Sequence, residues 1–441
     1  MRKIQLLLLS FILLWNSAIA YAGPREDYEE AYALYIAAAT SVAAYNDRIG
    51  ELTGRYLEQD GWHIDHYVQP QSRSGARFLL AKKESEPGKY LYVLAIVGTE
   101  TAGDMKINLK FDKVYFAGTT AEEFALNAAK KDVARTEPQV HKGFVEFIDS
   151  GPSAVLRNAA NTSLLLPDLL HMNPNDKLYL TGHSLGGAAA TLAGARLLSL
   201  GTQPEQLQII TFGAPAVGND AFAAAYAPVL PLTRVVIAGD PVTGVLQTLV
   251  GGYKQFGREI TWEKPATIDE PHRITGYVDA ALKNYYDKRQ LARQAGVKIA
   301  DPVAKKALNP GRVYIAPLQN NLPAAITGDF WYMREALVDE YRKTLPDCLI
   351  IDKTGTGNWR EEALAAGCQW VIVPEISGSR LKEQKDSYLL TFNQLVLDAD
   401  TGVAVDAAIF STRTYNLTPL EAFIHTFKGI NAHQTTWLKD R

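Results

Sequence analysis

The chain has 441 residues, of which 47% are hydrophobic, and its formal net charge at pH 7 is -3. This length and composition can bury a large core and predict two or three domains. Because acidic and basic residues nearly balance, nucleic-acid binding has no electrostatic support, and we expect no nucleic-acid partner.

The chain begins with the pattern of a secretory signal peptide. Arg2 and Lys3 give a cationic start, an apolar stretch follows, and small-x-small sites end at Ala20 and Ala22. We predict that residues 1–22 are cleaved and that the mature protein is soluble, either in the periplasm or secreted. An uncleaved anchor is the alternative. No later stretch is apolar for long enough to span a bilayer.

A helix is predicted at 25–57, before the first strands. Strand patterns follow at 62–69, 76–84 and 89–98. A polar segment covers 100–140, and from Lys177 onward strands alternate with helices. This alternation predicts an α/β fold with a mostly parallel central sheet, whose reactive groups lie at the carboxyl ends of the strands.

A second α/β pattern follows a polar helical stretch, and we place the boundary near residue 308. The mature chain then has a larger domain at 23–308 and a smaller α/β domain at 309–441. The β-α-β-α-β-β order of the smaller domain is similar to accessory domains of bacterial envelope proteins, such as the amino-terminal domain of TolB. Docking to an envelope protein partner through this domain is a hypothesis.

The smaller domain ends with a predicted hairpin and a helix. Residues 387–399 and 402–413 have the alternating pattern of two paired strands. The last helix begins at Thr418, with Pro419 first inside it and Glu421 in capping-box position.

Two cysteines, Cys348 and Cys368, each stand just before a predicted strand of the smaller domain. If these are neighbouring parallel strands, both cysteines lie at the same end of the sheet. In an oxidising compartment this favours a disulfide, with two buried thiols as the alternative. Neither cysteine has the spacing of a metal site, and we expect no metal and no cofactor.

The segment KLYLTGHSLGG at 177–187 has the order strand, sharp turn, helix that a nucleophile elbow requires. Gly182 and Gly186 lack the β-carbons that would collide where the strand and helix close on the turn. Ser184 can then point outward, and the backbone N–H of Leu185 can stabilise an oxyanion. A serine that only caps the helix is the alternative.

A serine nucleophile needs a base, and the α/β-hydrolase order of serine, acid and histidine restricts the choice. Three histidines follow Ser184, namely His272, His425 and His433. The last two belong to the smaller domain, so His272 remains by elimination. A solvated loop histidine is the alternative.

Asp240 is the predicted acid because it ends a strand at the rim where Ser184 lies. Asp220 opens a helix and is better explained as its cap. Asp269, three positions before His272, is the reserve candidate. In this hypothesis Ser184 attacks the carbonyl, His272 moves the proton, and Asp240 fixes the imidazole.

Six segments together resemble the class 3 lipases, over roughly residues 25–290 and in the family's order. They are AIVGTE, VHKGFVEF, LTGHSLGGAAATLAG, ITFGAPAVGNDAF, RVVIAGDPVTGVL and the histidine loop. The resemblance implies an α/β-hydrolase fold with Ser184, Asp240 and His272 as the triad. It also places Thr99, just after the glycine of the first segment, at the oxyanion hole.

The resemblance has one departure and two further implications. Val97 stands where the family usually has arginine, which bears on the polar network under the oxyanion loop. His141 and Gly143 match the family's H-x-G-F element, for which we expect a scaffolding role. Residues 100–138 occupy the place of a lid, with a strand near 107–111 and a helix at 121–135; an ungated surface excursion is the alternative.

We therefore predict an exported serine carboxylester hydrolase, a lipase or esterase that cleaves acylglycerol-type esters through an acyl-enzyme. Its partners would be a lipid or ester substrate and, transiently, a membrane or lipid interface. A phospholipase or lipid acyltransferase with the same triad is one alternative. A non-catalytic envelope adaptor on a hydrolase scaffold is the alternative from another class.

Overall fold

The structure is a computed structural model that describes most of the chain after residue 22. The described ranges are 23–45, 47–68, 77–98, 112–147, 156–158, 163–164, 173–300, 312–345, 347–351, 358–382 and 386–431. The predicted signal peptide and the boundary near 308 lie outside them. Within these ranges, no helix has the length and apolar character needed to cross a membrane.

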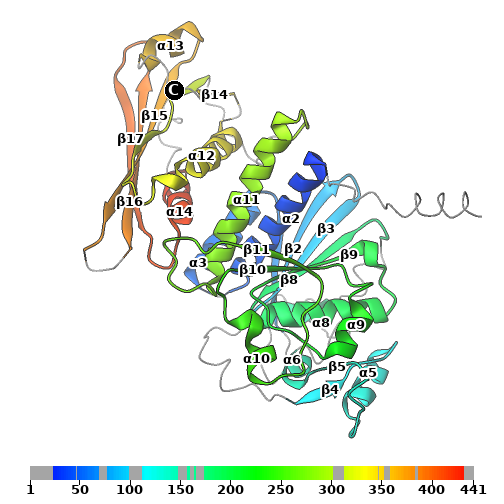
Figure 1. Cartoon of the computed structure of the whole chain (residues 1–441). Coiled ribbons are helices and arrows are strands. Elements are labelled where there is room, and N and C mark those ends of the chain that lie inside the picture. Colours follow the sequence, from blue (N-terminus) through cyan, green and yellow to red (C-terminus); the bar gives the residue numbers. More distant parts are fainter. Residues whose placement is uncertain are drawn as a thin grey trace, which may run out of the picture.

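A mixed sheet, parallel in its central and catalytic part, forms the centre of the larger unit (Figure 1). Its order among the described residues is β11-β10-β9-β8-β3-β2-β1-β6-β7. The strands are β1 His63–Val68, β2 Arg77–Glu86, β3 Lys89–Ile96, β6 Leu156–Asn158, β7 Ser163–Leu164, β8 Lys177–His183, β9 Leu207–Phe212, β10 Leu232–Ile237 and β11 Arg258–Trp262. Strands β3, β8, β9, β10 and β11 are parallel, which confirms the predicted α/β class.

Helices cover both faces of this sheet (Figure 1). They are α2 Pro24–Ala43, α3 Arg48–Gln59, α5 Ala121–Ala128, α6 Lys142–Phe147, α8 Leu185–Ser199, α9 Asp220–Tyr226, α10 Val245–Leu249 and α11 Ile274–Gln294. Because strand side chains alternate, Leu94 packs towards α8 while its neighbour Val93 packs towards α2 and α11. We call the larger sheet with these helices the hydrolase unit.

The segment 25–57 is helical as predicted, but it forms two helices, so the prediction of one continuous helix was wrong. Helix α2 ends at Ala43, and α3 begins at Arg48 after the cap residue Asp47. The Asp47 side chain accepts a hydrogen bond of 2.7 Å from the backbone N–H of Gly50. This bond satisfies an N–H at the start of a new helix, which is how Asp favours a cap over a helix interior.

The described part of the predicted lid, from residue 112 onward, is anchored to the hydrolase core. Strand β4 (Lys113–Tyr115) pairs with β5 (Gln139–His141), and α5 follows β4. Phe116 and Phe124 are buried against Phe222 and one another. The predicted helix at 121–135 ends early, at Ala128. The strand predicted near 107–111 lies outside the described residues, and gating stays a prediction.

A second sheet with three helices forms what we call the accessory unit. The strand order is β14-β12-β15-β16-β17, with β13 also paired to β15. The elements are β12 Val313–Ile315, β13 Gln319–Asn321, α12 Phe330–Thr344, β14 Leu349–Ile350, α13 Trp359–Ala365, β15 Trp370–Arg380, β16 Tyr388–Asp398, β17 Ala404–Arg413 and α14 Pro419–Asn431. The antiparallel pairing of β16 with β17 confirms the predicted hairpin.

The predicted start of the last helix is also confirmed. The Thr418 hydroxyl accepts a hydrogen bond of 3.2 Å from the Glu421 N–H, and the Glu421 carboxylate accepts one of 2.9 Å from the Thr418 N–H. This reciprocal pair is the capping box expected from the sequence.

The two cysteines are free thiols, so the expectation of a disulfide was wrong. Strand β12 lies between β14 and β15: Tyr314 pairs with Leu349 on one side and Val371 on the other. Two strand spacings separate Cys348 from Cys368, about 9.6 Å, whereas a disulfide needs Cα atoms within about 7 Å.

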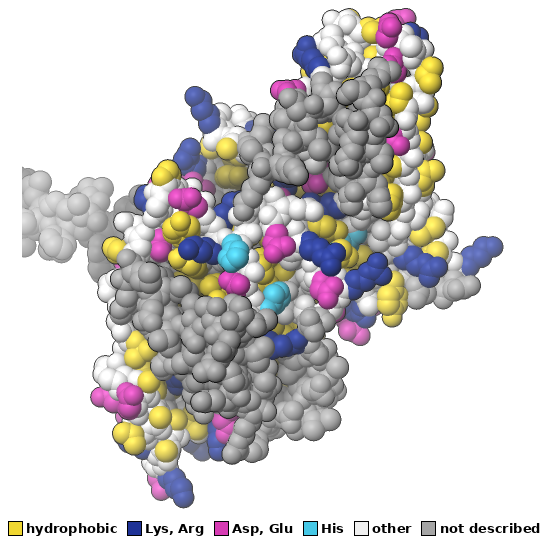
Figure 2. Space-filling model, turned by 180° about the vertical axis from the view of Figure 1, so that it is seen from behind, with side chains coloured by type: hydrophobic (Ala, Val, Ile, Leu, Met, Phe, Trp, Pro, Cys, Tyr) yellow, Lys and Arg dark blue, Asp and Glu magenta, His cyan; other side chains and the backbone are white. Residues whose placement is uncertain are grey.

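Charged groups of both signs are interspersed on the described surface seen in Figure 2, in agreement with the small net charge. On β1, the exposed His63 and the half-buried Asp65 form a pair at 3.1 Å. Such a pair contributes at most about 1 kcal/mol to folding.

Candidate active site

Ser184 stands on a sharp turn between β8 and α8. Its backbone has φ 59° and ψ -126°, a conformation that L-residues rarely adopt and that costs on the order of 1–3 kcal/mol. A β-carbon on Gly182 would lie 2.4 Å from the Gly186 carbonyl carbon, and one on Gly186 would lie 2.0 Å from the Ile96 oxygen. Both positions therefore require glycine, as the sequence pattern predicted.

The structure brings Ser184, His272 and Asp240 into one hydrogen-bonded chain. The His272 Nε2 lies 3.0 Å from the Ser184 Oγ. The His272 Nδ1 lies 2.8 Å and 3.0 Å from the two carboxylate oxygens of Asp240. An ionised carboxylate only accepts, so Nδ1 holds the proton and, in the neutral ring, Nε2 accepts from the serine hydroxyl.

These three residues lie after the carboxyl ends of three parallel strands of the same sheet. Ser184 follows β8, Asp240 follows β10, and His272 lies in the loop after β11. The Asp240 carboxylate has no exposed area, and the His272 side chain is 15% exposed. The imidazole can therefore meet a substrate from one side while its acid partner stays out of water.

Asp240 is held as a carboxylate by its hydrogen bonds. Burial raises its pKa, but the hydrogen bond and charge of His272, the Tyr277 hydroxyl and the Val242 N–H together lower that pKa below its ordinary value. The Tyr277 hydroxyl donates at 2.6 Å and the Val242 N–H at 2.9 Å. Burial and then the charge of Asp240 raise the pKa of Tyr277, so its hydroxyl stays a donor.

His183, next to the serine, binds the backbone of the histidine loop. Its Nε2 lies 2.7 Å from the His272 carbonyl oxygen, and its Nδ1 lies 3.2 Å from the Tyr45 hydroxyl. A carbonyl only accepts, so Nε2–H donates and Nδ1 accepts from Tyr45. Burial and then the neighbouring His272 lower the pKa of His183 to about 3, which keeps the ring neutral.

Tyr277 and His183 were missed by the sequence reasoning. Signals for both were present: Tyr277 lies five residues after His272 on the helix that the histidine loop enters, and His183 is the first of the two variable residues of the G-x-S-x-G pattern. A tyrosine or histidine near a catalytic residue in the sequence can have many purely structural roles. Only the fold shows which residues these two contact.

The two predicted oxyanion donors have different outcomes. Leu185 is the first residue of α8, so its backbone N–H has no acceptor within the helix. Thr99 lies outside the described residues. Its neighbour Gly98 approaches the elbow closely, because a β-carbon there would lie 2.7 Å from the His183 carbonyl oxygen.

The remaining acid candidates stand apart from His272. Asp269 is exposed, whereas both oxygens of Asp240 lie within reach of the His272 Nδ1. Asp220 is the first residue inside α9, and its predicted capping role was wrong. The cap is Asn219, whose side chain accepts a hydrogen bond of 2.9 Å from the Phe222 N–H.

Two of the other named histidines have partners away from the serine. His141 is 1% exposed, and its ring stacks on Phe144 with centroids 4.2 Å apart. His425 lies on α14, and its Nδ1 is 2.9 Å from the Tyr56 hydroxyl. His433 lies outside the described residues.

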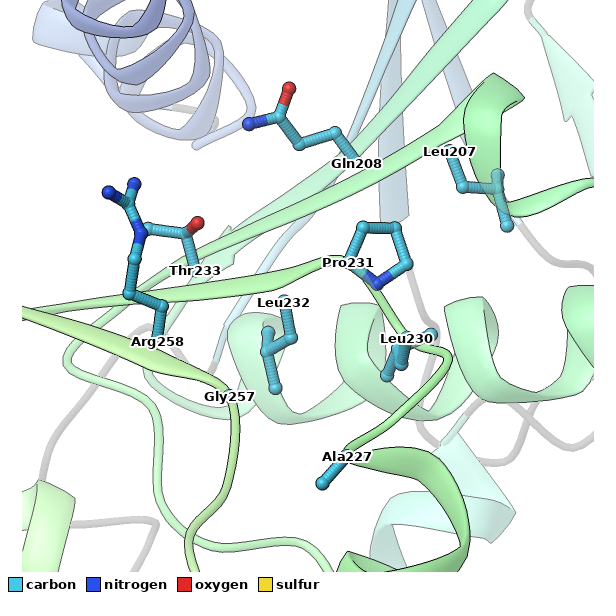
Figure 3. A pocket seen from close by; sticks show the side chains of 9 residues that line it. All are labelled: Leu207, Gln208, Ala227, Leu230, Pro231, Leu232, Thr233, Gly257 and Arg258. Carbon is cyan, nitrogen blue, oxygen red and sulfur yellow. The ribbon is translucent and has the colours of Figure 1, made fainter. Parts of the chain in front are cut away.

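A pocket lies at the opposite end of the sheet from Ser184 (Figure 3). It is lined by Leu207, Gln208, Ala227, Leu230, Pro231, Leu232, Thr233, Gly257 and Arg258. Three of these begin strands β9, β10 and β11, so the pocket is at the amino ends of the strands. Ligands of open parallel sheets bind at the carboxyl ends, and we do not assign this pocket to the candidate site.

A mostly parallel sheet whose strand ends gather a serine, a histidine and an aspartate in this order defines the α/β-hydrolase class. Residues 93–249 match the family model described as lipase (class 3). Through this segment, the chain is similar to the class 3 lipases.

Individual relatives match over shorter stretches. A lipase of Caenorhabditis elegans is 46% identical over 70 residues, which are 15% of this chain and 20% of the relative. The secreted mono- and diacylglycerol lipase 1 of Fusarium solani is 33% identical over 136 residues, which are 31% of this chain and 38% of the relative. The chain thus spans a fifth to two fifths of the length of these curated relatives.

Among solved structures, the chain is similar to the lipase of Rhizomucor miehei in its propeptide complex. The TM-score is 0.41 at 21% sequence identity, and the match covers 53% of this chain and 68% of that one.

Proposed function

We propose that this protein is an exported serine carboxylester hydrolase that cleaves lipid esters. The observation that supports this best is the unbroken hydrogen-bonded chain from the Ser184 hydroxyl through His272 to Asp240. The strained elbow that presents the serine is a second support, because a residue that merely capped a helix would not need it.

In the proposed reaction, the Ser184 Oγ attacks the ester carbonyl carbon while His272 Nε2 takes the hydroxyl proton. The N–H of Leu185, together with Thr99, would bind the oxyanion of the tetrahedral intermediate. Collapse breaks the bond to the alcohol, which leaves with the proton from His272, and an acyl-enzyme remains. Water then attacks in the same way, releasing the fatty acid and restoring the Ser184 hydroxyl.

Acylglycerols are the proposed substrates, and the proposed location is outside the cytoplasm. The match of residues 93–249 to the class 3 lipase model supports lipid esters, and the similarity to the secreted mono- and diacylglycerol lipase of Fusarium solani supports mono- and diacylglycerols. The signal-peptide pattern at residues 1–22 supports export.

The test is the variant Ser184→Ala, compared with the wild type on mono-, di- and triacylglycerols and on phospholipids. We expect ester turnover to fall on the order of 10⁴- to 10⁶-fold, because without the serine hydroxyl no acyl-enzyme can form. A fluorophosphonate probe should label the wild type and not the variant. Faster turnover of phospholipids than of acylglycerols would favour the phospholipase alternative.

Full turnover by a correctly folded Ser184→Ala protein would overturn the proposal. A wild type that neither turns over esters nor reacts with the probe would favour a non-catalytic adaptor instead. Circular dichroism of both proteins separates these outcomes from unfolding.

A further inference from the structure

The accessory unit contacts the active-site helix α11 directly, and this gives it a role in the proposed reaction. Helix α11 begins at Ile274, two residues after His272. On its side towards the sheet, the Tyr277 hydroxyl holds Asp240. The position of α11 therefore sets the positions of two members of the triad.

Two residues of the accessory unit bind α11 near His272. The Arg273 side chain donates a hydrogen bond to the Asn416 side-chain oxygen. One turn and a half further on, the Asp279 carboxylate accepts a hydrogen bond of 2.6 Å from the Thr418 hydroxyl. Asp279 is 1% exposed and Thr418 is fully buried, so water cannot replace this bond.

Further contacts bind the rest of α11 to the accessory unit. The Lys283 ammonium lies 2.7 Å from Asp329, and the Arg289 guanidinium lies 2.6 Å from Asp339. Leu282 and Tyr286 share one hydrophobic core with helices α12 and α14. In Figure 1, α12 and α14 lie beside α11, in agreement with these contacts. From residue 273 to 289 the contacts extend along about 24 Å of helix.

The segment that makes the two contacts near His272 has its own fixed shape. Asn416 has φ 59°, a left-handed conformation that asparagine tolerates better than most residues. On one side, the Thr414 hydroxyl accepts a hydrogen bond of 2.9 Å from the Tyr388 N–H. On the other side, Thr418 and Glu421 form the capping box of α14. Both contacts therefore start from a rigid support.

We propose that Asn416 and Thr418 are positioning residues, through which the accessory unit holds the start of α11 and thereby aligns His272 with Ser184. This inference rests on the proposed function of the triad. Neither residue touches the reacting atoms, so their loss should leave substrate binding unchanged. It should slow the chemical step, because His272 would be less well aligned with Ser184.

The experiment measures kcat and KM on a chromogenic p-nitrophenyl ester, and the rate of labelling by a fluorophosphonate probe. Asn416→Gly removes the acceptor for Arg273 and keeps the left-handed backbone without strain. Asn416→Asp restores an acceptor. Thr418→Val removes the hydroxyl that donates to Asp279, and Thr418→Ser restores it.

Two control variants make similar changes in the accessory unit, at residues for which no bond to α11 has been described above. Asp386→Gly replaces another residue with positive φ in the accessory unit, where φ is 56°. Thr426→Val removes another buried hydroxyl of α14, one that donates to the Ala422 carbonyl of the same helix. Thermal unfolding of each variant shows that it is folded.

We expect Asn416→Gly and Thr418→Val each to lower kcat and the labelling rate about tenfold with KM unchanged, because small misplacements of a catalytic group have large effects on rate. Asn416→Asp, Thr418→Ser and both controls should stay near wild type. Folded Asn416→Gly protein with wild-type kcat and labelling would overturn the inference, even if Thr418→Val unfolds. A wild type that the probe does not label would instead overturn the proposed function.

Discussion

At the scale of single residues, the candidate site depends on groups that orient the triad as much as on the triad itself. Tyr277 binds Asp240, and His183 binds the carbonyl of His272. Both neighbours are buried. The raised pKa of Tyr277 keeps its hydroxyl protonated, and the lowered pKa of His183 keeps its ring neutral. His272 is thus held in two places: Asp240 binds its ring, and His183 binds its backbone carbonyl.

The variant Tyr277→Phe tests the support of Asp240. The tyrosine hydroxyl stabilises the carboxylate, so its removal should raise the pKa of Asp240 and lower kcat by about tenfold, the value of one hydrogen bond to a charged group. The lowered pKa of Asp240 in the folded protein contributes stability that is fully present above its unfolded pKa of about 4 and is lost as pH falls through the folded pKa.

The measurement is kcat together with urea unfolding at pH 7 and at pH 3. We expect Tyr277→Phe to cost more stability at pH 7 than at pH 3. Tyr226→Phe is the matched control, because its hydroxyl pairs with Ser199, away from the triad. Equal losses at the two pH values would contradict the assigned cause of the low Asp240 pKa.

At the scale of secondary-structure elements, the turn between β8 and α8 shows which features a sequence can predict. The glycines of the elbow, the parallel strands after it and the hairpin of the accessory unit depend on local patterns, and these predictions hold. Order along the chain, the domain boundary and the position of Asp240 at a strand end together selected Asp240 and His272, which the structure brings together.

Features that depend on the order of strands in space could not be predicted in this way. Strand β14 pairs with β12, which separates Cys348 from Cys368, and no local pattern indicates that pairing. The helix break before Asp47 was also missed, because a side-chain cap competes with helix continuation through a single hydrogen bond. The contacts of Tyr277 and Thr418 join residues that are far apart in the chain.

The variant Gly186→Ala tests the close approach at the elbow. The added β-carbon would lie 2.0 Å from the backbone oxygen of Ile96, so β3 and α8 would have to move apart. We expect a loss of about 3 kcal/mol in the free energy of unfolding, as for other overpacked sites, together with loss of esterase activity. Gly244→Ala is the control, since its β-carbon would meet no atom within 4 Å. Urea unfolding measures both, and equal stabilities would show that the elbow can relax.

At the scale of the whole molecule, the two units share buried charges as well as a hydrophobic core. Arg289 of α11 is 1% exposed and pairs with Asp339 at 2.6 Å and Glu335 at 3.0 Å, both on α12. Burial raises the pKa of Asp339, and the charge of Arg289 opposes that rise. We therefore expect this pair to make the folding of one unit depend on the other.

Replacing Arg289 with Met should leave Asp339 as an unpaired buried carboxylate and cost about 3–5 kcal/mol at pH 7. The pKa of Asp339 should then rise further, so the folded variant takes up a proton that the unfolded chain at the same pH does not hold. Its stability relative to wild type should consequently recover as pH is lowered from 7 towards 5.

Urea unfolding at both pH values tests this, with Arg289→Met/Asp339→Leu as the variant that removes both charges. The double variant should be more stable at pH 7 than the single one, because the buried Asp339 carboxylate is gone and Glu335 still has Arg334 at 3.6 Å. Arg25→Met is the control for loss of a positive charge, since Arg25 is 61% exposed and lies 4.0 Å from Glu29. A single cooperative transition in the wild type and two in Arg289→Met would show that this pair joins the units. Equal stability of Arg289→Met and Arg25→Met would instead mean that the Arg289 ion pair does not stabilise the interface.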